Sequence, residues 1–139
     1  MNTLNILLAE DNLADILLVR KALNEHEIPH ELHVVRDGEE ALAFIEGMGE
    51  PDGIPCPDIV LLDVNLPKVE GAEILSEFRK HPQCANTPVV VITSSDARGD
   101  RDRMAQLGIS HYFKKPSDLD AFLKLGAVVR EVVEGTALK

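Results

Sequence analysis

The sequence has no tryptophan, one tyrosine and four phenylalanines, and its two cysteines are Cys56 and Cys84. These cysteines lack the spacing of metal ligands, and without a secretion signal they are predicted to be reduced thiols in a cytoplasm. Residues 1–5 lack the basic start and long apolar stretch of a signal peptide. No apolar run approaches the roughly 20 residues of a transmembrane helix, so we expect no membrane span.

Basic residues are scarce: the chain has 14 Lys and Arg against 24 Asp and Glu, which gives a net charge of -10. This charge opposes a phosphate backbone, so we expect no nucleic-acid binding. A divalent cation among carboxylates could still let a local site handle a phosphoryl group. The length of 139 residues and the 45% hydrophobic content predict a single domain over residues 1–139, with its core at about 4–134.

Short apolar runs alternate with longer amphipathic segments. The pattern predicts strands over 4–9, 31–36, 58–62, 88–93 and 110–113, and helices over 12–26, 38–46, 71–80, 99–107 and 118–134. Strands that alternate with helices favour right-handed crossovers and a parallel sheet with helices on both faces. The expected fold class is therefore a doubly wound α/β domain.

Segment 47–57 interrupts this alternation with three glycines and three prolines. It is predicted to be a long loop at the sheet edge opposite the acidic residues, either as a tolerated insertion or as a functional loop. Its Gly47-Met48-Gly49 is no dinucleotide-binding fingerprint, because it follows a helix and is closed by prolines.

Five chemically active residues follow or end the apolar runs: Glu10, Asp11, Asp63, Thr93 and Lys115. A parallel sheet gathers such strand ends along one edge, where ligands bind. Each residue alone has an ordinary explanation, such as acids near a helix N-terminus or a solvated lysine. Together the three carboxylates would repel one another unless a cation lay between them, and oxygen ligands suit Mg²⁺ or Mn²⁺. The five histidines share no helix face or strand-end cluster, so no histidine metal site is expected.

Four segments together resemble the receiver domains of bacterial two-component response regulators. They are Ile6-Leu7-Leu8-Ala9-Glu10-Asp11, Asp63-Val64-Asn65-Leu66-Pro67 with Gly71 after it, Val90-Val91-Ile92-Thr93-Ser94, and Tyr112-Phe113-Lys114-Lys115-Pro116. The resemblance covers about residues 4–134. It implies a flavodoxin-like (βα)5 fold whose five parallel strands have the order 2-1-3-4-5.

The resemblance also implies residue roles. Asp63 would be the phosphoacceptor, taking a phosphoryl group from a phosphohistidine of a sensor histidine kinase. Mg²⁺ would be held by Asp11, Asp63, the backbone carbonyl of Asn65 and, through water, Glu10. The ion and Lys115 would offset charge on the phosphoryl oxygens. The chain would be a switch that catalyses only its own phosphorylation and dephosphorylation.

Two further residues would transmit the switch: Thr93 would move toward the acyl phosphate, and Tyr112 would change its rotamer in response. By the same resemblance Asn65 and Ser95 would flank the path of the attacking water and tune the lifetime of the acyl phosphate. Glu70 stands where the family usually has Asp or Asn before Gly71, and Glu10 replaces the commoner Asp of the acid pair.

No segment is left for a DNA-binding effector domain, so we expect a stand-alone receiver that signals by protein contact or phosphorelay. Three features together resemble the single-domain receivers that serve bacterial phytochrome histidine kinases: the loop over 47–57, the missing effector, and the Asp63–Pro67 segment with Lys68. On the first helix an arc of Leu13, Ala14, Leu17 and Leu18 is a candidate docking surface for the kinase. The last helix is equally apolar, which fits either a deeply buried helix or a homodimer through the fourth helix, fifth strand and fifth helix.

Two rival functions belong to other classes. A Mg²⁺-dependent phosphohydrolase would want a second acid two residues after its nucleophile, but Asn65 stands there. A scaffold that uses the fold without phosphorylation predicts that acetyl phosphate leaves no label on Asp63.

Overall fold

A computed structural model describes residues 3–48, 53, 55–94 and 98–137. Its strands are β1 Leu4–Ala9, β2 His30–Val35, β3 Ile59–Leu62, β4 Val89–Thr93 and β5 His111–Lys114. The helices are α1 Leu13–Glu25, α2 Gly38–Glu46, α3 Gly71–Arg79, α4 Arg98–Gln106, α5 Leu119–Leu123 and α6 Leu125–Ala137, and Pro82–Cys84 forms a 3₁₀ turn, η1. The strands make one parallel sheet in the order β2-β1-β3-β4-β5. The fold and strand order expected from the sequence are confirmed.

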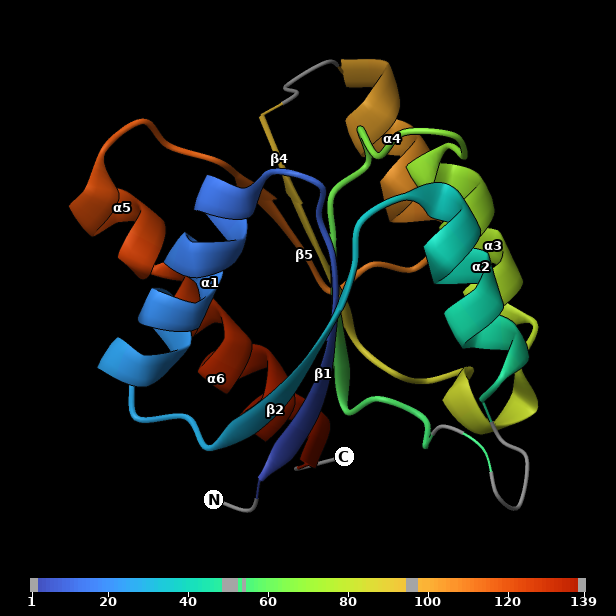
Figure 1. Ribbon diagram of the computed structural model, residues 1–139, viewed down its shortest axis with the longest axis horizontal. Coiled ribbons are helices and arrows are strands. Elements are labelled where there is room, and N and C mark those ends of the chain that lie inside the picture. Colours follow the sequence, from blue (N-terminus) through green and yellow to red (C-terminus); the bar gives the residue numbers. More distant parts are fainter. Residues whose placement is uncertain (1–2, 49–52, 54, 95–97, 138–139) are drawn as a thin grey trace.

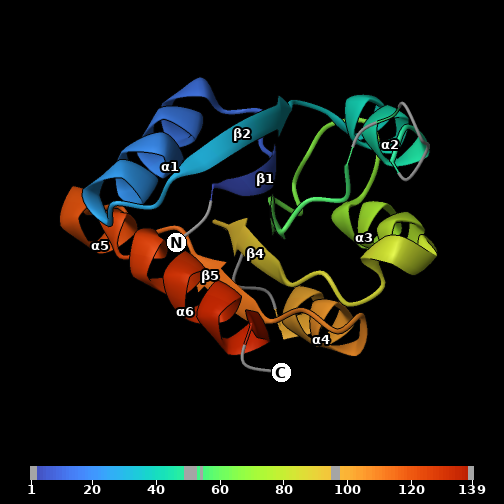
Figure 2. The ribbon, with the colours of Figure 1, turned by 90° about the horizontal axis from the view of Figure 1, so that it is seen from below.

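Helices cover both faces of the sheet: α1, α5 and α6 lie on one side, and α2, α3 and α4 on the other (Figures 1 and 2). The central strands are apolar on both faces because successive side chains point in opposite directions. Leu7, Val60 and Val91 enter the core beside α2–α4, whereas Leu8, Leu61 and Ile92 enter the core beside α1, α5 and α6. The edge strands β2 and β5 instead alternate or mix exposed and half-buried residues.

The predicted elements are present with boundaries that differ by about a residue, except for the last helix. The segment predicted as one helix over 118–134 is two helices, α5 and α6, which meet at Lys124. The cause is a tertiary contact: His26 Nε2, at the end of α1, donates to the backbone oxygen of Leu123 at 3.1 Å. Gly126 lets α1 approach at this point, since a Cβ there would overlap the His26 ring and the Ala22 carbonyl.

The prediction of two reduced cysteines is wrong for this structure, because Cys56 and Cys84 form a disulfide with a Cα–Cα distance of 5.9 Å. Cys56 precedes β3 and Cys84 precedes β4, and these strands are neighbours in the sheet. The sheet order therefore brings together two residues that are 28 positions apart in the sequence.

Part of the predicted loop over 47–57 lies outside the described residues, namely 49–52 and 54. Of its described part, Met48 is only 1% exposed and packs in the core beside α2–α4. None of the helices in the described part of the chain is long and apolar enough to cross a membrane.

The apolar arcs of the helices divide between core and surface. On α1 the buried residues are Ile16, Val19, Ala22 and Leu23. In the other predicted arc Leu13 is 59% and Leu17 58% exposed, whereas Leu18 is half-buried and packs against the core. In the C-terminal pair, Phe122, Leu125 and Val129 are buried, so those helices supply much of the core on their side of the sheet.

Candidate functional site

The carboxyl ends of β1, β3 and β4 and the segment after β5 surround a cavity of about 430 Å³. Its lining consists of Glu10, Asp11, Asn12, Asp15, Asp63, Asn65, Ser94 and Lys115. Four of the five residues predicted from strand ends therefore meet here. The fifth, Thr93, is fully buried at the end of β4.

The Lys115 ammonium is the electrostatic centre of the cavity. Its Nζ lies 2.5 Å from Glu10 Oε1, 2.8 Å from Asp15 Oδ2 and 2.8 Å from Asp63 Oδ2. The Lys115 backbone N–H donates to the backbone carbonyl oxygen of Thr93 at 2.8 Å. This bond extends the β4–β5 pairing and fixes the position of the Lys115 backbone. Burial alone would lower the pKa of Lys115, but hydrogen bonds to Asp15, Asp63 and Glu10 raise it above its ordinary value. The side chain is therefore a permanent cation.

Asp63 is held at both carboxylate oxygens. Oδ2 accepts from Lys115, and Oδ1 accepts the backbone N–H of Asn65 at 2.9 Å. The Asp63 backbone N–H donates to the Ala9 oxygen, which places the residue at the end of the β1–β3 pair. The residue is 4% exposed, so its carboxylate is oriented by the fold rather than by solvent.

Glu10 is the most deeply buried of the acids and has no exposed surface. Burial raises the pKa of its carboxyl to about 7, and the negative charge of Asp63 adds to this effect. Two contacts lower the pKa of Glu10 without overcoming the effect of burial. One is with Lys115, and the other is with the Asn12 backbone N–H, which donates to Glu10 Oε2 at 3.2 Å.

Glu10, Asp11 and Asp63 each offer one carboxylate oxygen, and these oxygens all lie within 4.8 Å of one another. Three hard oxygen donors at this spacing fit Mg²⁺ or Mn²⁺, which prefer carboxylate, carbonyl and water ligands. No other group of this kind is found in the part of the chain that the structure describes. The acidic cluster predicted from the sequence thus has the composition of a divalent-cation site.

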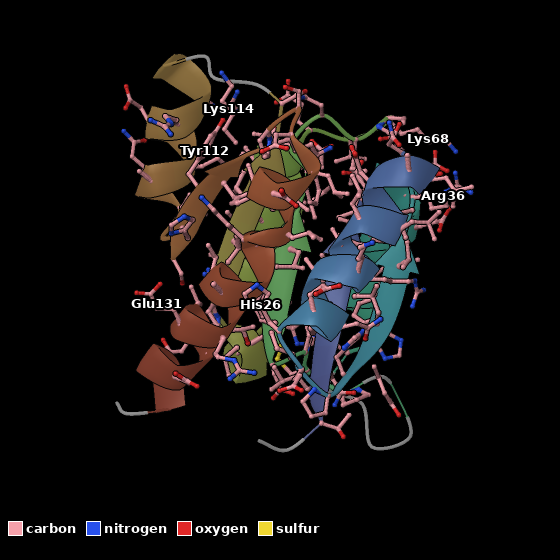
Figure 3. All side chains as sticks on the ribbon, turned by 90° about the vertical axis from the view of Figure 1, so that its left-hand side faces the viewer. His26, Arg36, Lys68, Tyr112, Lys114 and Glu131 are labelled. Carbon is pink, nitrogen blue, oxygen red and sulfur yellow. A yellow bond between two sulfur atoms is a disulfide. The ribbon has the colours of Figure 1, made fainter. Side chains whose placement is uncertain are left out.

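Thr93 and Tyr112, predicted as switch residues, are not among the residues given above as lining the cavity. Thr93 Oγ1 accepts from the Asn65 side-chain amide at 3.0 Å. Tyr112 is half-buried on β5, and the Arg101 guanidinium of α4 lies 4.7 Å from its ring centroid. Tyr112 and Lys114 lie on the part of β5 that adjoins α4 (Figure 3). Ser95 lies outside the described residues.

Lys68 in the loop and Gly38 at the start of α2 explain how the segment after Asp63 is positioned. Lys68 has φ 77°, which is unusual for a residue with a side chain, and its Nζ pairs with Asp37 at 3.4 Å and Glu39 at 3.3 Å. Gly38 donates to the Pro67 oxygen at 2.9 Å, and a Cβ there would lie 2.7 Å from Val69 N. The loop between β3 and α3 is therefore held against the start of α2 by these ion pairs and this hydrogen bond.

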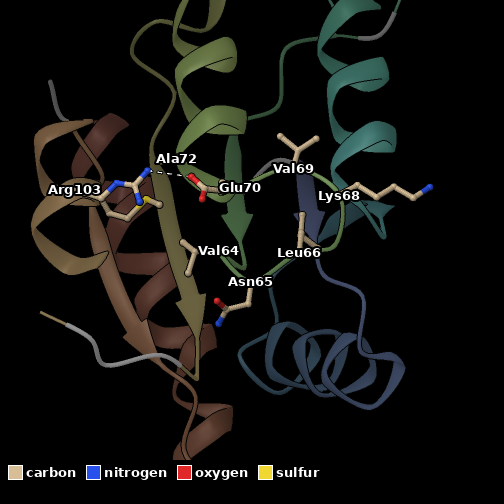
Figure 4. Close-up of a pocket in the computed structure, with 10 residues that line it drawn as sticks. Val64, Asn65, Leu66, Lys68, Val69, Glu70, Ala72 and Arg103 are labelled. Atoms are coloured by element: carbon tan, nitrogen blue, oxygen red, sulfur yellow. Dashed lines mark hydrogen bonds and ion pairs between the residues drawn. The ribbon is translucent and has the colours of Figure 1, made fainter. Parts of the chain in front are cut away.

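Glu70, the departure from the family's usual residue, bonds to α4. Its Oε2 lies 3.2 Å from Arg103 Nη2 across a cavity of about 440 Å³ between the β3–α3 loop and α4 (Figure 4). Both side chains are exposed, so the pair contributes on the order of 0–1 kcal/mol.

Asp15 is the site residue that sequence reasoning missed. It lies in the first turn of α1, and its backbone N–H donates to Asn12 Oδ1 at 3.1 Å. The available signal was its nearness in the sequence to the acid pair, since it lies four positions after Asp11.

Comparisons with known proteins agree with this geometry. Residues 6–126 match the model of the response regulator receiver domain family. The chain is 40% identical over 120 residues to the response regulator Rcp1 of Synechocystis sp., a match that covers 86% of this chain and 82% of that protein. It also resembles the crystal structure of the phosphorylated cyanobacterial phytochrome response regulator RcpA, with a TM-score of 0.85, 36% identity and coverage of 97% and 96% of the two chains. The Mn²⁺-bound form of Rcp1 gives a TM-score of 0.81 and 38% identity, with 92% of each chain covered.

Proposed function

The chain belongs to the response regulator receiver domain family, and we propose that Asp63 is the carboxylate on which it is phosphorylated. As a receiver it accepts a phosphoryl group from a sensor histidine kinase and changes conformation to signal. The observation that carries the assignment is the position of Asp63, which is 2.8 Å from the Lys115 ammonium and belongs to the cluster of three carboxylates. The same arrangement supports residues 1–139 acting as one receiver domain.

The cofactor is Mg²⁺, for which Mn²⁺ can substitute. We propose that Asp11, Asp63 and the backbone carbonyl of Asn65 hold it directly, and Glu10 through a water molecule. When bound, the ion neutralises negative charge on the carboxylates and on the incoming phosphoryl oxygens. Glu10 and Asp63 also pair with the Lys115 ammonium, so the ion and the ammonium would share these two acids.

In the transfer step an Asp63 oxygen attacks the phosphorus of a phosphohistidine. The oxygen–phosphorus bond forms, the phosphorus–nitrogen bond breaks, and the imidazole nitrogen keeps the bonding electron pair. The Asn65 N–H holds Asp63 Oδ1, so the carboxylate needs little rotation to react. Lys115 exchanges its bond to Asp63 Oδ2 for bonds to phosphoryl oxygens, which stabilises the charge that develops there.

The conformational switch is proposed to start at Thr93. Its hydroxyl would leave the Asn65 amide for a phosphoryl oxygen, and the adjacent end of β4 would follow. Tyr112, packed under Arg101 of α4, would then change its rotamer and alter the α4–β5 surface. The new charge on Asp63 thereby changes a surface that a partner can bind.

The proposed kinase partner is a bacteriophytochrome, because Rcp1 and RcpA are among the similar proteins and RcpA is described as a phytochrome response regulator. The exposed Leu13 and Leu17 on α1, beside the cavity, offer an apolar surface for its phosphohistidine domain. We also propose a homodimer through α4, β5 and the C-terminal helices α5 and α6, to be tested by sedimentation with and without beryllofluoride. A cytoplasmic location, expected from the sequence, stays a prediction.

The phosphoacceptor is tested by incubating the protein with labelled acetyl phosphate and Mg²⁺. We expect one acid-stable, base-labile label on Asp63 that Asp63→Asn abolishes, whereas Asp58→Asn, an exposed acid at the amino end of β3, keeps it. Label that persists in Asp63→Asn would contradict the assignment. Sustained hydrolysis of small phosphate esters would instead favour a phosphohydrolase.

A further inference from the structure

The Lys115 ammonium has three carboxylate partners: it donates hydrogen bonds to Asp15 and Asp63 and forms an ion pair with Glu10. The roles of these partners differ. Glu10 and Asp63 also belong to the group of oxygens that could hold a metal ion, whereas Asp15 does not. In addition, the proposed reaction converts the Asp63 carboxylate into an acyl phosphate, whose negative charge lies on the phosphoryl oxygens and no longer on the carboxylate oxygens. Asp15 is therefore the carboxylate partner of Lys115 that neither binds the metal nor is phosphorylated.

Asp15 is the partner of Lys115 that lies on α1. It lies in the first turn of the helix, where its backbone N–H is capped by Asn12 Oδ1 at 3.1 Å. The next residue, Ile16, is 5% exposed and anchors that turn in the core. The Asp15 side chain itself is 20% exposed, so its bond to Lys115 is largely shielded from water.

We propose that Asp15 is a positioning residue that keeps the Lys115 ammonium over the cavity when Glu10 and Asp63 are engaged by Mg²⁺ and the phosphoryl group. The inference rests on the proposed function of Asp63 and Lys115. Asp15 touches no reacting atom in this account. It acts by giving Lys115 a fixed counter-ion on α1, so that the lysine side chain does not have to be ordered during the transfer step.

The first test compares phosphorylation rates. Asp15→Asn keeps the size of the side chain and removes its charge. At saturating Mg²⁺ and acetyl phosphate we expect the maximal rate to fall about tenfold, because a charge-assisted hydrogen bond to Lys115 is weakened. The Kd for Mg²⁺, measured by direct titration, should change by no more than about threefold, since Asp15 is not a ligand. Asp15→Glu should recover part of the rate.

Glu25→Gln is the matched control, because it removes one charge from an exposed position at the far end of the same helix. It should leave both the rate and the Mg²⁺ affinity unchanged. An equal loss of rate in Glu25→Gln and Asp15→Asn would overturn the inference, since it would assign the effect to net charge.

The second test is a double-mutant cycle with Lys115→Ala. If Asp15 acts through Lys115, Asp15→Asn slows phosphorylation of the lysine-containing protein but not of Lys115→Ala. Equal slowing in both backgrounds, or no slowing in either, overturns the positioning role of Asp15. The proposed function still stands in that case if the unmutated protein is labelled. If the unmutated protein is not labelled at all, the proposed function fails and the inference fails with it.

Discussion

At the scale of single residues, the protonation of Glu10 links the site to stability. The pKa of Glu10 is about 7 in the folded protein against an ordinary value of 4.5, so between these pH values the folded protein holds a proton that the unfolded chain has released. The free energy of unfolding therefore falls as pH rises from about 4.5 to about 7, by up to about 3 kcal/mol. Urea unfolding in metal-free buffer measures this slope.

Glu10→Gln should lack that contribution, because the amide does not titrate, and its stability should depend less on pH over the same window. Glu31→Gln, an exposed position on β2, should retain the slope of the unmutated protein. Identical slopes in the Glu10→Gln variant and the unmutated protein would show that Glu10 ionises normally.

The residues of the site differ in how far the sequence could predict them. Glu10, Asp11, Asp63 and Lys115 could be placed together because each follows an apolar strand, and strand ends of a parallel sheet share an edge. Asp15 could not, because its bond to Lys115 depends on how α1 is oriented over a strand that begins 96 positions later. The individual roles came from the family resemblance and stay predictions for this chain.

At the scale of elements, the close approach of α1 to α6 depends on Gly126. Gly126→Ala would force the His26 ring and the Ala22 carbonyl apart from the new methyl group. We expect destabilisation of about 2 kcal/mol, because overpacking outweighs the better helix propensity of alanine. The denaturation midpoint in urea should fall with an unchanged m-value.

Gly135→Ala is the matched control on the same helix. A Cβ at Gly135 would meet nothing within 4 Å, so the free energy of unfolding should stay unchanged or rise by about 0.5 kcal/mol. If Gly126→Ala were as well tolerated as Gly135→Ala, the packing of α1 on α6 would be looser than the structure indicates.

This contact also explains the one helix that was predicted wrongly. Apolar residues recur without interruption over 118–134, so periodicity alone predicts a single helix. The break at Lys124 is imposed by His26 from another part of the chain. The other helices and strands were predicted within about a residue because short apolar runs and amphipathic segments alternate along the chain and mark their limits.

At the scale of the whole molecule, the Cys56–Cys84 disulfide joins the amino ends of two neighbouring strands. It closes a loop with a sequence separation of 28 residues. Constraint of the unfolded chain by a loop of that length stabilises the fold by about 3 kcal/mol. Urea unfolding with and without dithiothreitol should show this difference, whereas Cys84→Ser should be insensitive to the reductant. A Cys84→Ser midpoint that shifts with reductant would indicate another cause.

The global architecture was predictable in part. Alternation of strands and helices predicts a parallel sheet with helices on both faces, but the order β2-β1-β3-β4-β5 came from the family resemblance. The disulfide could not be predicted, because two cysteines without context are consistent with free thiols. Only the neighbouring positions of β3 and β4 make the pairing evident.

The two edge strands of the described sheet, β2 and β5, affect how readily the protein aggregates at high concentration. They carry exposed polar side chains such as Glu31, His33, His111 and Lys114. Another molecule that added a strand at either margin would have to desolvate charged or polar groups. The strongly apolar, amyloid-compatible segments β3 and β4 are meanwhile enclosed by neighbours on both sides, so aggregation requires prior unfolding.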